Sequence, residues 1–352
     1  MLHDENDPWR CFLPASYDLD APPSTLIPPG RSVLVTGAGG YIGSALVKAL
    51  AGAAPRSLVL LDASEQNLFD IDRHLDSVPH AAFLGSVDDR KLLDRIFARY
   101  RPEVVYHAAA FKHVPLLERN PVAAIRNNAL GTYTLAQAGL RHGTARLVLV
   151  STDKAVRPHS AMGVSKRIAE LAVVALSNPA CRMNAIRLGN VIGSSGSVVP
   201  EFHRQIAAGG PVTVTHPEVS RWFLSPRAAV DAILAAGNVP CEGRILLPEL
   251  GEAVRIAALA AFLIGAAGKD IPIVYTGLRP GDKLEESLVS SDEVQGEFVD
   301  GLQIIETTRL APEELEEIMR RLAAGVACDD AAALIDELVS IVPEYVPSEL
   351  LR

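Results

Sequence analysis

The residues best suited to do chemistry are an acid and a base that stand next to each other, Asp153 and Lys154. A neighbouring carboxyl group and amine shift each other's pKa, which lets one site hold both a proton donor and a proton acceptor. Most adjacent Asp-Lys pairs are solvated surface ion pairs. This pair directly follows an apolar run that ends at Ser151 and Thr152, and α/β sheets build their sites where strands end. That position favours a reaction centre.

A second pair lies on the helix expected to follow. Lys166 comes four residues after Met162, so both face the same side of that helix. This is the layout of a Tyr-x-x-x-Lys pair with methionine where the tyrosine is expected. The lysine of such a pair holds the nicotinamide ribose, and the tyrosine removes a hydroxyl proton during hydride transfer. Met162 cannot accept a proton.

A glycine-rich turn, Thr36-Gly37-Ala38-Gly39-Gly40-Tyr41-Ile42-Gly43, joins the first expected strand to the first expected helix. Its glycines allow the backbone to approach a pyrophosphate, and the free N–H groups of the helix start bind it. The turn alone is weak evidence, but Asp62 closes the second strand, where a carboxylate binds a ribose 2′-hydroxyl and repels a 2′-phosphate. The small Ala108 and Ala109 let a cofactor lie against the chain. The sequence predicts NAD, with NADP as the alternative.

These residues are positioned by short apolar runs that alternate with longer helical patterns. The expected strands are Ser32–Thr36, Ser57–Leu61, Ala81–Leu84, Val104–His107, Arg146–Ser151 and Asn184–Leu188. The expected helices are Ile42–Ala51, Gln66–Leu75, Arg90–Tyr100, Pro121–Arg141 and Ala161–Leu176, with Asp89 and Asn120 capping the third and fourth. The order predicts an α/β fold, a Rossmann-type doubly wound parallel sheet with a smaller C-terminal substrate-binding lobe.

The expected organisation has three parts. Residues 1–30 are rich in proline and form an N-terminal arm. Residues 31–190 form the NAD-binding Rossmann domain. Residues 191–352 form mainly the substrate-binding lobe and a helical tail.

Composition excludes several classes of protein. The 352 residues carry a net charge of −9, and the pI is near 5.5, so nucleic acid and anionic membranes are not expected partners. The four cysteines form no metal pattern, and no metal site is expected. The acidic start lacks a signal peptide, and the apolar stretch 256–268 is too short to cross a membrane. We therefore expect a soluble, cytoplasmic protein with no membrane span.

Several segments in order resemble the capsular polysaccharide biosynthesis branch of the extended short-chain dehydrogenases/reductases, which are UDP-N-acetylglucosamine 4,6-dehydratases. The resemblance runs from Arg31 to Tyr345 and includes members with methionine in place of the tyrosine. Its distinctive segments are 35–40, 107–115, 151–156, 188–198, 210–217, 276–284 and 342–345.

The resemblance implies an internal redox cycle that ends in loss of water. The sugar is oxidised at C4, a base removes the C5 proton, the C6 hydroxyl leaves, and hydride returns to C6. By resemblance, Asp153 protonates the leaving hydroxyl and Lys154 takes the C5 proton. Because Met162 cannot be the C4 base, we weigh Lys166, Thr152, Ser151 and an ordered water for that task.

The resemblance also implies a UDP-sugar site and a homo-oligomer. Asn128 matches an asparagine that supports the active site, and a homodimer would form through the fourth and fifth helices. The residues expected to line the substrate site are Lys112, His113, Asn190, Ser195, Ser197, Arg221 and Arg279. The two arginines are the expected pyrophosphate clamps, since guanidinium groups bind phosphate bidentately.

Two other functions compete with the dehydratase. A 4-epimerase or simple dehydrogenase of the same fold needs redox chemistry at C4 but no elimination pair, so Asp153 and Lys154 argue against it. A non-catalytic dinucleotide-binding regulator would need none of Asp153, Lys154 and Lys166, yet all three are present.

Overall fold

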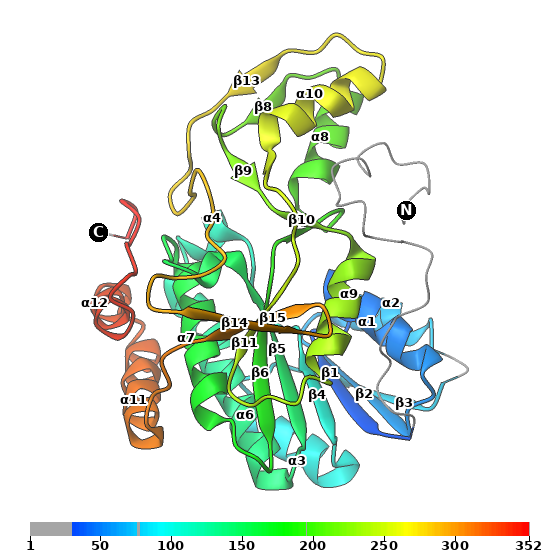
Figure 1. The fold of residues 1–352 in the computed structure, drawn as a ribbon, viewed down its shortest axis with the longest axis vertical. Helices are drawn as coiled ribbons and strands as arrows, with labels where there is room; N and C mark the ends of the chain where they lie inside the picture. The colour runs from blue at the N-terminus through cyan, green and yellow to red at the C-terminus, as the bar shows by residue number, and fades with distance from the viewer. Residues whose placement is uncertain (1–29, 76–77, 195, 352) are drawn as a thin grey trace.

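The centre of the computed structural model is one mixed sheet, and the structure describes residues 30–75, 78–194 and 196–351 (Figure 1). The strands of this sheet are β1 (Ser32–Thr36), β2 (Ser57–Asp62), β3 (His80–Leu84), β4 (Val104–His107), β5 (Arg146–Thr152), β6 (Arg182–Leu188), β11 (Ile245–Pro248), β14 (Val294–Val299) and β15 (Leu302–Glu306). Their order is β14-β15-β11-β6-β5-β4-β1-β2-β3. The strands from β3 to β11 are parallel, and β15 and β14 are antiparallel. The predicted Rossmann-type α/β sheet is confirmed, with an antiparallel hairpin at one edge.

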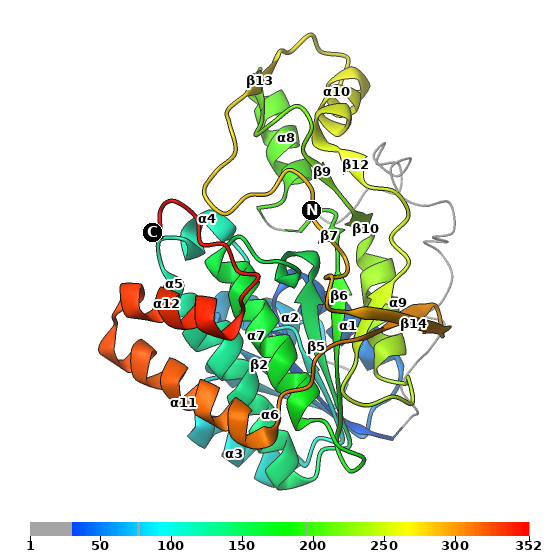
Figure 2. The same cartoon turned by 60° about the vertical axis from the view of Figure 1, so that its left-hand side comes forward.

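Helices cover both faces of the sheet. In chain order, the helices of the described residues are α1 (Tyr41–Gly52), α2 (Glu65–Asp72), α3 (Arg90–Tyr100), α4 (Val114–Leu117), α5 (Pro121–Ala124), the π-helix η2 (Ile125–Leu130), α6 (Gly131–His142), the short η3 (Asp153–Ala155), α7 (Ala161–Leu176), α8 (Val198–Ala207), α9 (Pro226–Ala236), α10 (Ile256–Ala266), α11 (Pro312–Cys328) and α12 (Ala331–Ile341). Figure 2 shows α7 and α9 on opposite sides of β5 and β6. Helix α1 packs against α9, and α6 packs between α3 and α7.

One local prediction around residue 120 is wrong, and another holds only in part. The helix expected over Pro121–Arg141 is interrupted by η2, whose wider turns depend on tertiary contacts that a helical pattern does not reveal. Asn120 is at the N-cap position as predicted, but its side chain makes no capping hydrogen bond, and its amide donates instead to Leu116 O (2.8 Å) in the preceding helix. Asp89 does cap α3 and accepts a hydrogen bond from Leu92 N (3.0 Å).

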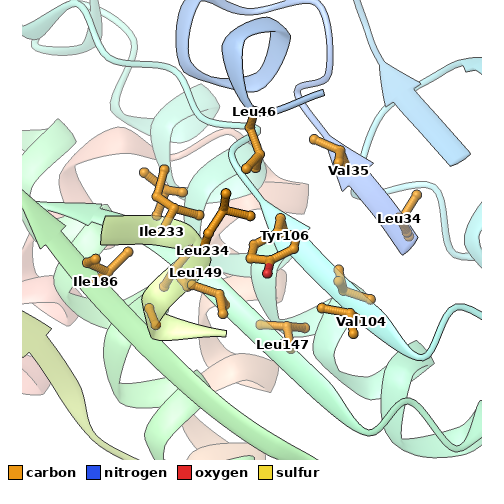
Figure 3. Close-up of a cluster of buried hydrophobic side chains, with 14 of the residues drawn as sticks. Leu34, Val35, Leu46, Val104, Tyr106, Leu147, Leu149, Ile186, Ile233 and Leu234 are labelled. Carbon is orange, nitrogen blue, oxygen red and sulfur yellow. The ribbon is translucent and has the colours of Figure 1, made fainter. Parts of the chain in front are cut away.

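The apolar core lies between the sheet and its helices. Figure 3 shows Leu34, Tyr106, Leu149, Ile186 and Ile233, which come from four strands and α9 and are all fully buried. Such runs of apolar residues occur in parallel strands because helices cover both faces of the sheet. This core holds the carboxyl ends of β1, β4 and β5 side by side.

Residues 191–352 divide between the main sheet and a smaller lobe. The lobe holds α8, α10 and short strand pairs; the short strands are β7 (Asn190–Val191), β8 (Val212–Val214), β9 (Ser220–Arg221), β10 (Phe223–Leu224), β12 (Val254–Arg255) and β13 (Ile273–Tyr275). It has a core of its own that includes Phe202 and Leu263. Strand β11 and the β14–β15 hairpin return to the main sheet. The smaller lobe is thus an insertion above the carboxyl edge (Figure 1).

Helices α11 and α12 cover the outer face of the α5, η2 and α7 segments (Figure 2). Ile318 and Leu322 of α11 share an apolar cluster with Ile125, Ile168 and Leu171. This is the face through which the sequence led us to expect a homodimer. The chain covers part of this face with its own helices, on the side of α5, η2 and α7.

The apolar stretch at 256–268 forms α10, a helix of 11 residues. Within the ranges that the structure describes, no helix is long and apolar enough to cross a membrane. The proline-rich arm predicted for residues 1–30 lies almost wholly outside those ranges.

A buried ion network fastens the second half of the chain to the first. The Arg187 guanidinium on β6 contacts a carboxylate oxygen of Glu170 on α7 (2.8 Å) and one of Glu293, just before β14 (2.7 Å). All three side chains are 0% exposed. Arg167 adds a contact to Glu293 (3.0 Å), and Ser151 Oγ donates to Glu170 (2.7 Å).

Arg187→Leu should destabilise the fold strongly. It leaves only Arg167 to balance two buried carboxylates, and removing one partner of a buried pair costs about 3–5 kcal/mol. Urea denaturation measures the change in unfolding free energy. The control is Arg204→Leu, which removes an exposed ion pair with Glu201 and should cost less than about 1 kcal/mol. Equal losses in the two variants would contradict a structural role for the network.

Candidate active site

The predicted acid–base pair lies where β5 ends. Asp153 and Lys154 start the short helix η3, and Thr152 Oγ1 accepts a hydrogen bond from Lys154 N (3.4 Å) at its beginning. Lys154 Nζ donates to Asp153 Oδ1 at 2.9 Å. The Asp153 side chain is 0% exposed and that of Lys154 is 20% exposed. The pair is therefore a mostly buried contact and not a solvated surface ion pair.

Lys154 has further polar neighbours from distant parts of the chain. Its Nζ donates to Asn190 Oδ1 (3.1 Å) and lies 3.8 Å from Glu286 Oε1. Burial opposes a charge on this lysine, but Asp153 and Glu286 outweigh it and raise the pKa of Lys154. Lys154 is thus an ammonium held between two carboxylates.

Asp153 keeps unused acceptor capacity. Thr152 Oγ1 donates to its Oδ1 (2.9 Å), the same oxygen that Lys154 contacts. Its other oxygen, Oδ2, is buried and has no hydrogen-bond partner among the described residues. A buried carboxylate oxygen normally has a partner, so this one suits a proton or a substrate hydroxyl.

Met162 and Lys166 lie in different surroundings. Met162 is buried in an apolar cluster with Val114, Leu117 and Ala124. Lys166 Nζ donates to Val150 O (2.7 Å), and burial lowers its pKa to about 8, with Glu170 opposing. Lys166 therefore reaches the reaction edge, whereas Met162 presents only apolar surface.

Asn128 joins three elements behind the site. Its side chain accepts a hydrogen bond from Phe111 N (2.8 Å) and donates to Phe111 O (3.0 Å) and Ser165 Oγ (2.9 Å). It lies in η2, and π-helical turns are frequent at functional sites. The neighbouring His107 bridges Thr36 (2.7 Å) and Thr132 (2.8 Å), and burial lowers its pKa to about 3, so its ring is neutral.

The glycine-rich turn is shaped as a cradle. Gly37 has φ +64°, and a Cβ there would lie 2.6 Å from Ala109 N. A Cβ on Gly43 would lie 1.9 Å from Gly37 O, so neither position accepts a side chain. Gly40 is the N-cap of α1 and provides no capping side chain. The start of α1 therefore presents backbone N–H groups and the positive end of the helix dipole to the cradle, as anion sites at helix N-termini do.

Asp62 stabilises the turn that follows β2 and also contacts the glycine-rich cradle. Its carboxylate accepts hydrogen bonds from Gly39 N (2.9 Å) and Ser64 N (2.8 Å). An ionised carboxylate has about four acceptor positions, so capacity for a ribose diol remains. Tyr41 Oη donates to Ile192 O (2.8 Å), which joins the glycine-rich turn to the root of the smaller lobe.

The expected substrate residues gather near one rim, with one outside the described ranges. Lys112 and His113 are exposed, and a Cβ on Gly196 would lie 2.6 Å from His113 Cε1, so these two loops touch. Ser197 Oγ is buried with no partner among the described residues, at the start of α8. Ser195 lies outside the described residues.

The two expected clamp arginines are engaged within the protein. Arg221 donates to the carbonyls of Ser220 (2.6 Å), Leu284 (3.1 Å) and Lys283 (2.8 Å). Arg279 pairs with Asp282 (2.8 Å) and is 56% exposed. Arg221 thus fixes the 283–284 segment, and only Arg279 faces solvent.

Sequence reasoning missed Glu286 and its partner Lys283. Lys283 Nζ lies 2.8 Å from Glu286 Oε2 and donates to Val156 O (2.9 Å). Lys283 belongs to the segment 276–284 that carried the family resemblance, but no local pattern connects it with β5. Over the described ranges, no group of His, Cys, Asp and Glu is arranged to hold a metal ion.

Fold and site together define the class. A parallel sheet, a glycine-rich cradle at its first βα junction, an acid at the end of β2 and a lysine on α7 are the features of an extended short-chain dehydrogenase/reductase. Within that class, the chain belongs to the polysaccharide biosynthesis protein family, whose model matches residues 33–305.

Curated relatives support this family. EpsC of Bacillus subtilis, a probable polysaccharide biosynthesis protein, is 42% identical over 77% of this chain, and the capsular polysaccharide biosynthesis protein CapD of Staphylococcus aureus is 40% identical over 76%. The chain spans about half the length of each, since the match covers 47% of either relative.

Two shorter relatives have different activities. A UDP-N-acetylglucosamine 4,6-dehydratase (inverting) of Campylobacter jejuni is 31% identical, and a UDP-glucose 4-epimerase of Rickettsia canadensis is 32% identical. Each match covers 75% of this chain and 79% of the relative. Identity alone therefore does not separate the two reactions.

Solved structures show the same fold. Pen from Bacillus thuringiensis superposes with a TM-score of 0.73 at 24% identity, covering 80% of this chain and 88% of that chain. The dTDP-glucose 4,6-dehydratase DesIV from Streptomyces venezuelae, solved with NAD bound, has a TM-score of 0.65 at 22% identity, covering 73% and 88%.

Proposed function

We propose that the chain is a nucleotide-sugar 4,6-dehydratase that acts on UDP-N-acetylglucosamine or a close UDP-sugar in surface polysaccharide biosynthesis. The observation that carries the proposal is the buried pair of Asp153 and Lys154, 2.9 Å apart at the end of β5. An elimination across C5 and C6 needs an acid and a base of its own, whereas a 4-epimerase needs only the base of its redox step at C4. The Campylobacter relative supports the dehydratase, and the Rickettsia relative supports an epimerase as the second candidate.

The residues of the cradle fit a dinucleotide. The N-terminus of α1 would bind the pyrophosphate, Asp62 the adenosine ribose, and Lys166 the nicotinamide ribose, with Ala108 and Ala109 alongside. A bound NAD would supply the hydride acceptor for C4 and the hydride donor for C6. A full negative charge on Asp62 favours NAD over NADP.

The elimination assigns one task to each member of the pair. Lys154 takes the C5 proton, the C5–H electrons form the C5–C6 double bond, and the C6–O bond breaks. Asp153 gives its proton, so the oxygen leaves as water. Both tasks need Asp153 protonated and Lys154 neutral, so the observed ion pair (2.9 Å) must gain a proton on Asp153 and lose one from Lys154 before the elimination.

Thr152 is our choice for the C4 base. Ser151 is engaged with Glu170, and Lys166 with Val150 O, although its pKa of about 8 keeps it as the alternative. Thr152 Oγ1 donates to Asp153 Oδ1 (2.9 Å). It would take the C4 hydroxyl proton while its own proton passes to the Asp153 carboxylate, which gives Asp153 the proton needed at C6. Lys154 then loses its ammonium proton to solvent, to which its side chain is 20% exposed.

The remaining assignments follow from position. The unpartnered Ser197 hydroxyl at the start of α8, together with Asn190, Lys112 and His113, would line the UDP-sugar site. Arg279 is the better placed diphosphate clamp, because Arg221 would have to exchange three internal hydrogen bonds. We propose a homo-oligomer that uses a surface other than the one under α11 and α12.

The decisive experiment is proton NMR of the purified protein with UDP-N-acetylglucosamine in D₂O. A dehydratase should give a new 6-methyl signal, a 4-keto or hydrated product, and deuterium at C5. A 4-epimer with its C6 hydroxyl intact would move the protein to the epimerases. No conversion of any UDP-, GDP- or dTDP-sugar by cofactor-loaded protein would leave the regulator as the remaining function.

Cofactor choice should depend on the charge of Asp62. Wild-type protein should bind NAD more tightly than NADP, and Asp62→Asn should narrow the difference, because the amide keeps an acceptor but no longer repels a 2′-phosphate. Calorimetric dissociation constants for both cofactors test this. Asp70→Asn, exposed on α2, should change neither constant. Tighter NADP binding by the wild type would overturn the prediction.

Removal of the Thr152 hydroxyl should stop the first proton transfer. Thr152→Val should lower kcat by about 10²- to 10⁴-fold, the usual contribution of a general base, whereas Thr152→Ser should keep most of the rate. The measurement is the rate of C4 oxidation in a single turnover. If valine and serine variants behaved alike, Thr152 would not be the base, and Lys166 would take its place.

A further inference from the structure

Glu286 connects the smaller lobe with the catalytic pair. It follows β13 and the loop that returns from the lobe, and it is only 6% exposed. Its carboxylate lies 3.8 Å from Lys154 Nζ, 2.8 Å from Lys283 Nζ and 3.8 Å from Arg221 Nε. A buried carboxylate is costly unless cations compensate it, and one of the three cations here is the proposed C5 base.

The other two cations each have backbone partners in addition to Glu286. Lys283 donates to Val156 O (2.9 Å), and Arg221 donates to carbonyls of its own strand and of the 283–284 segment. Lys154 differs, because its remaining contacts are Asp153 and Asn190, both within the site. Removal of the Glu286 charge would therefore leave Lys283 and Arg221 held by backbone carbonyls, and Lys154 with Asp153 as its one carboxylate partner among the described residues.

We propose that Glu286 is a positioning residue that orients Lys154 and stabilises the ammonium formed when Lys154 takes the C5 proton. The inference rests on the proposed dehydratase function. Glu286 would act on Lys154 as the aspartate of a serine-protease triad acts on its histidine. That aspartate orients the base and stabilises the cation that forms on it. Asp153 cannot fill this role alone, because it must be protonated until it gives its proton to the leaving oxygen.

The charges around Lys154 determine whether loss of the Glu286 charge raises or lowers the pKa of Lys154. Asp153 and Glu286 favour the ammonium, and Arg221 opposes it. On its far side, Glu286 faces Lys283 and the His159 ring. Loss of the Glu286 charge should lower the pKa of Lys154. A base acts only when neutral, so the acidic limb of the rate profile should then move to lower pH, while the weaker base removes the C5 proton more slowly.

The test compares Glu286→Gln with Glu285→Gln, which removes the same charge from an exposed neighbour. Glu286→Gln should lower kcat by about one to two orders of magnitude and shift the acidic limb of kcat to lower pH. Glu285→Gln should change neither. Glu286→Asp keeps the charge and should give an acidic limb close to that of the wild type. If Glu286→Gln does not fold, Glu286→Asp still tests whether the charge at this position sets the acidic limb. A slower Glu286→Gln enzyme with an unmoved acidic limb would overturn the inference.

A second readout is independent of turnover. The pH dependence of trace acylation of Lys154, followed by mass spectrometry, reports the pKa of Lys154 in each variant. If wild type and Glu285→Gln convert no nucleotide sugar, the proposed function fails, yet a lower Lys154 pKa in Glu286→Gln would still support the Glu286–Lys154 coupling. An equal Lys154 pKa in the two variants would overturn that coupling whatever the enzyme does.

Discussion

Arg187 brings a full positive charge into the interior, and the geometry of the site depends on how that charge is balanced. A buried guanidinium needs carboxylates in fixed positions, and here they come from α7 and from the segment just before β14. Glu293 is thereby tied to the sheet only a few residues after Glu286, which limits where Glu286 lies. Ser151 belongs to the same network, because its hydroxyl donates a hydrogen bond to Glu170. Successive strand residues point to opposite faces, so Ser151 faces the network and Thr152 is left for the reaction edge.

The cofactor cradle and the acid–base pair lie at the same edge of the sheet, because the carboxyl ends of parallel strands lie side by side. Two contacts then join this edge to the smaller lobe. Tyr41 Oη donates to Ile192 O next to the glycine-rich turn, and His113 lies against Gly196 at the rim. Under the proposed function, these contacts bring the expected sugar-nucleotide residues of the lobe close to the glycine-rich cradle. Hydride and proton transfers at neighbouring carbons require this closeness.

Much of this site could be predicted from local sequence, because its parts follow strands. The apolar runs predicted the strands, and the glycine-rich turn, Asp62 and the Asp153–Lys154 pair were placed by their distance from strand ends. Glu286 could not be found in that way, since it reaches Lys154 only after the chain has passed through the whole smaller lobe. The π-helix η2 and the internal hydrogen bonds of Arg221 likewise depend on tertiary contacts. A residue type predicts what a group can do, and the fold decides which groups remain available to do it.

Methionine at position 162 agrees with the way the chain's C-terminal segment covers the start of α7. Val346 N donates to Pro158 O (3.0 Å), Ser348 bonds Glu118, and Glu118 in turn accepts a hydrogen bond from Ala161 N (2.6 Å). These contacts close an apolar pocket around Met162. A buried tyrosine hydroxyl in that pocket would need a polar partner, and Val114, Leu117, Ala124 and Ala161, which pack with Met162, cannot be that partner. This agrees with the proposal that Thr152, which donates a hydrogen bond to Asp153 on the same edge, is the C4 base.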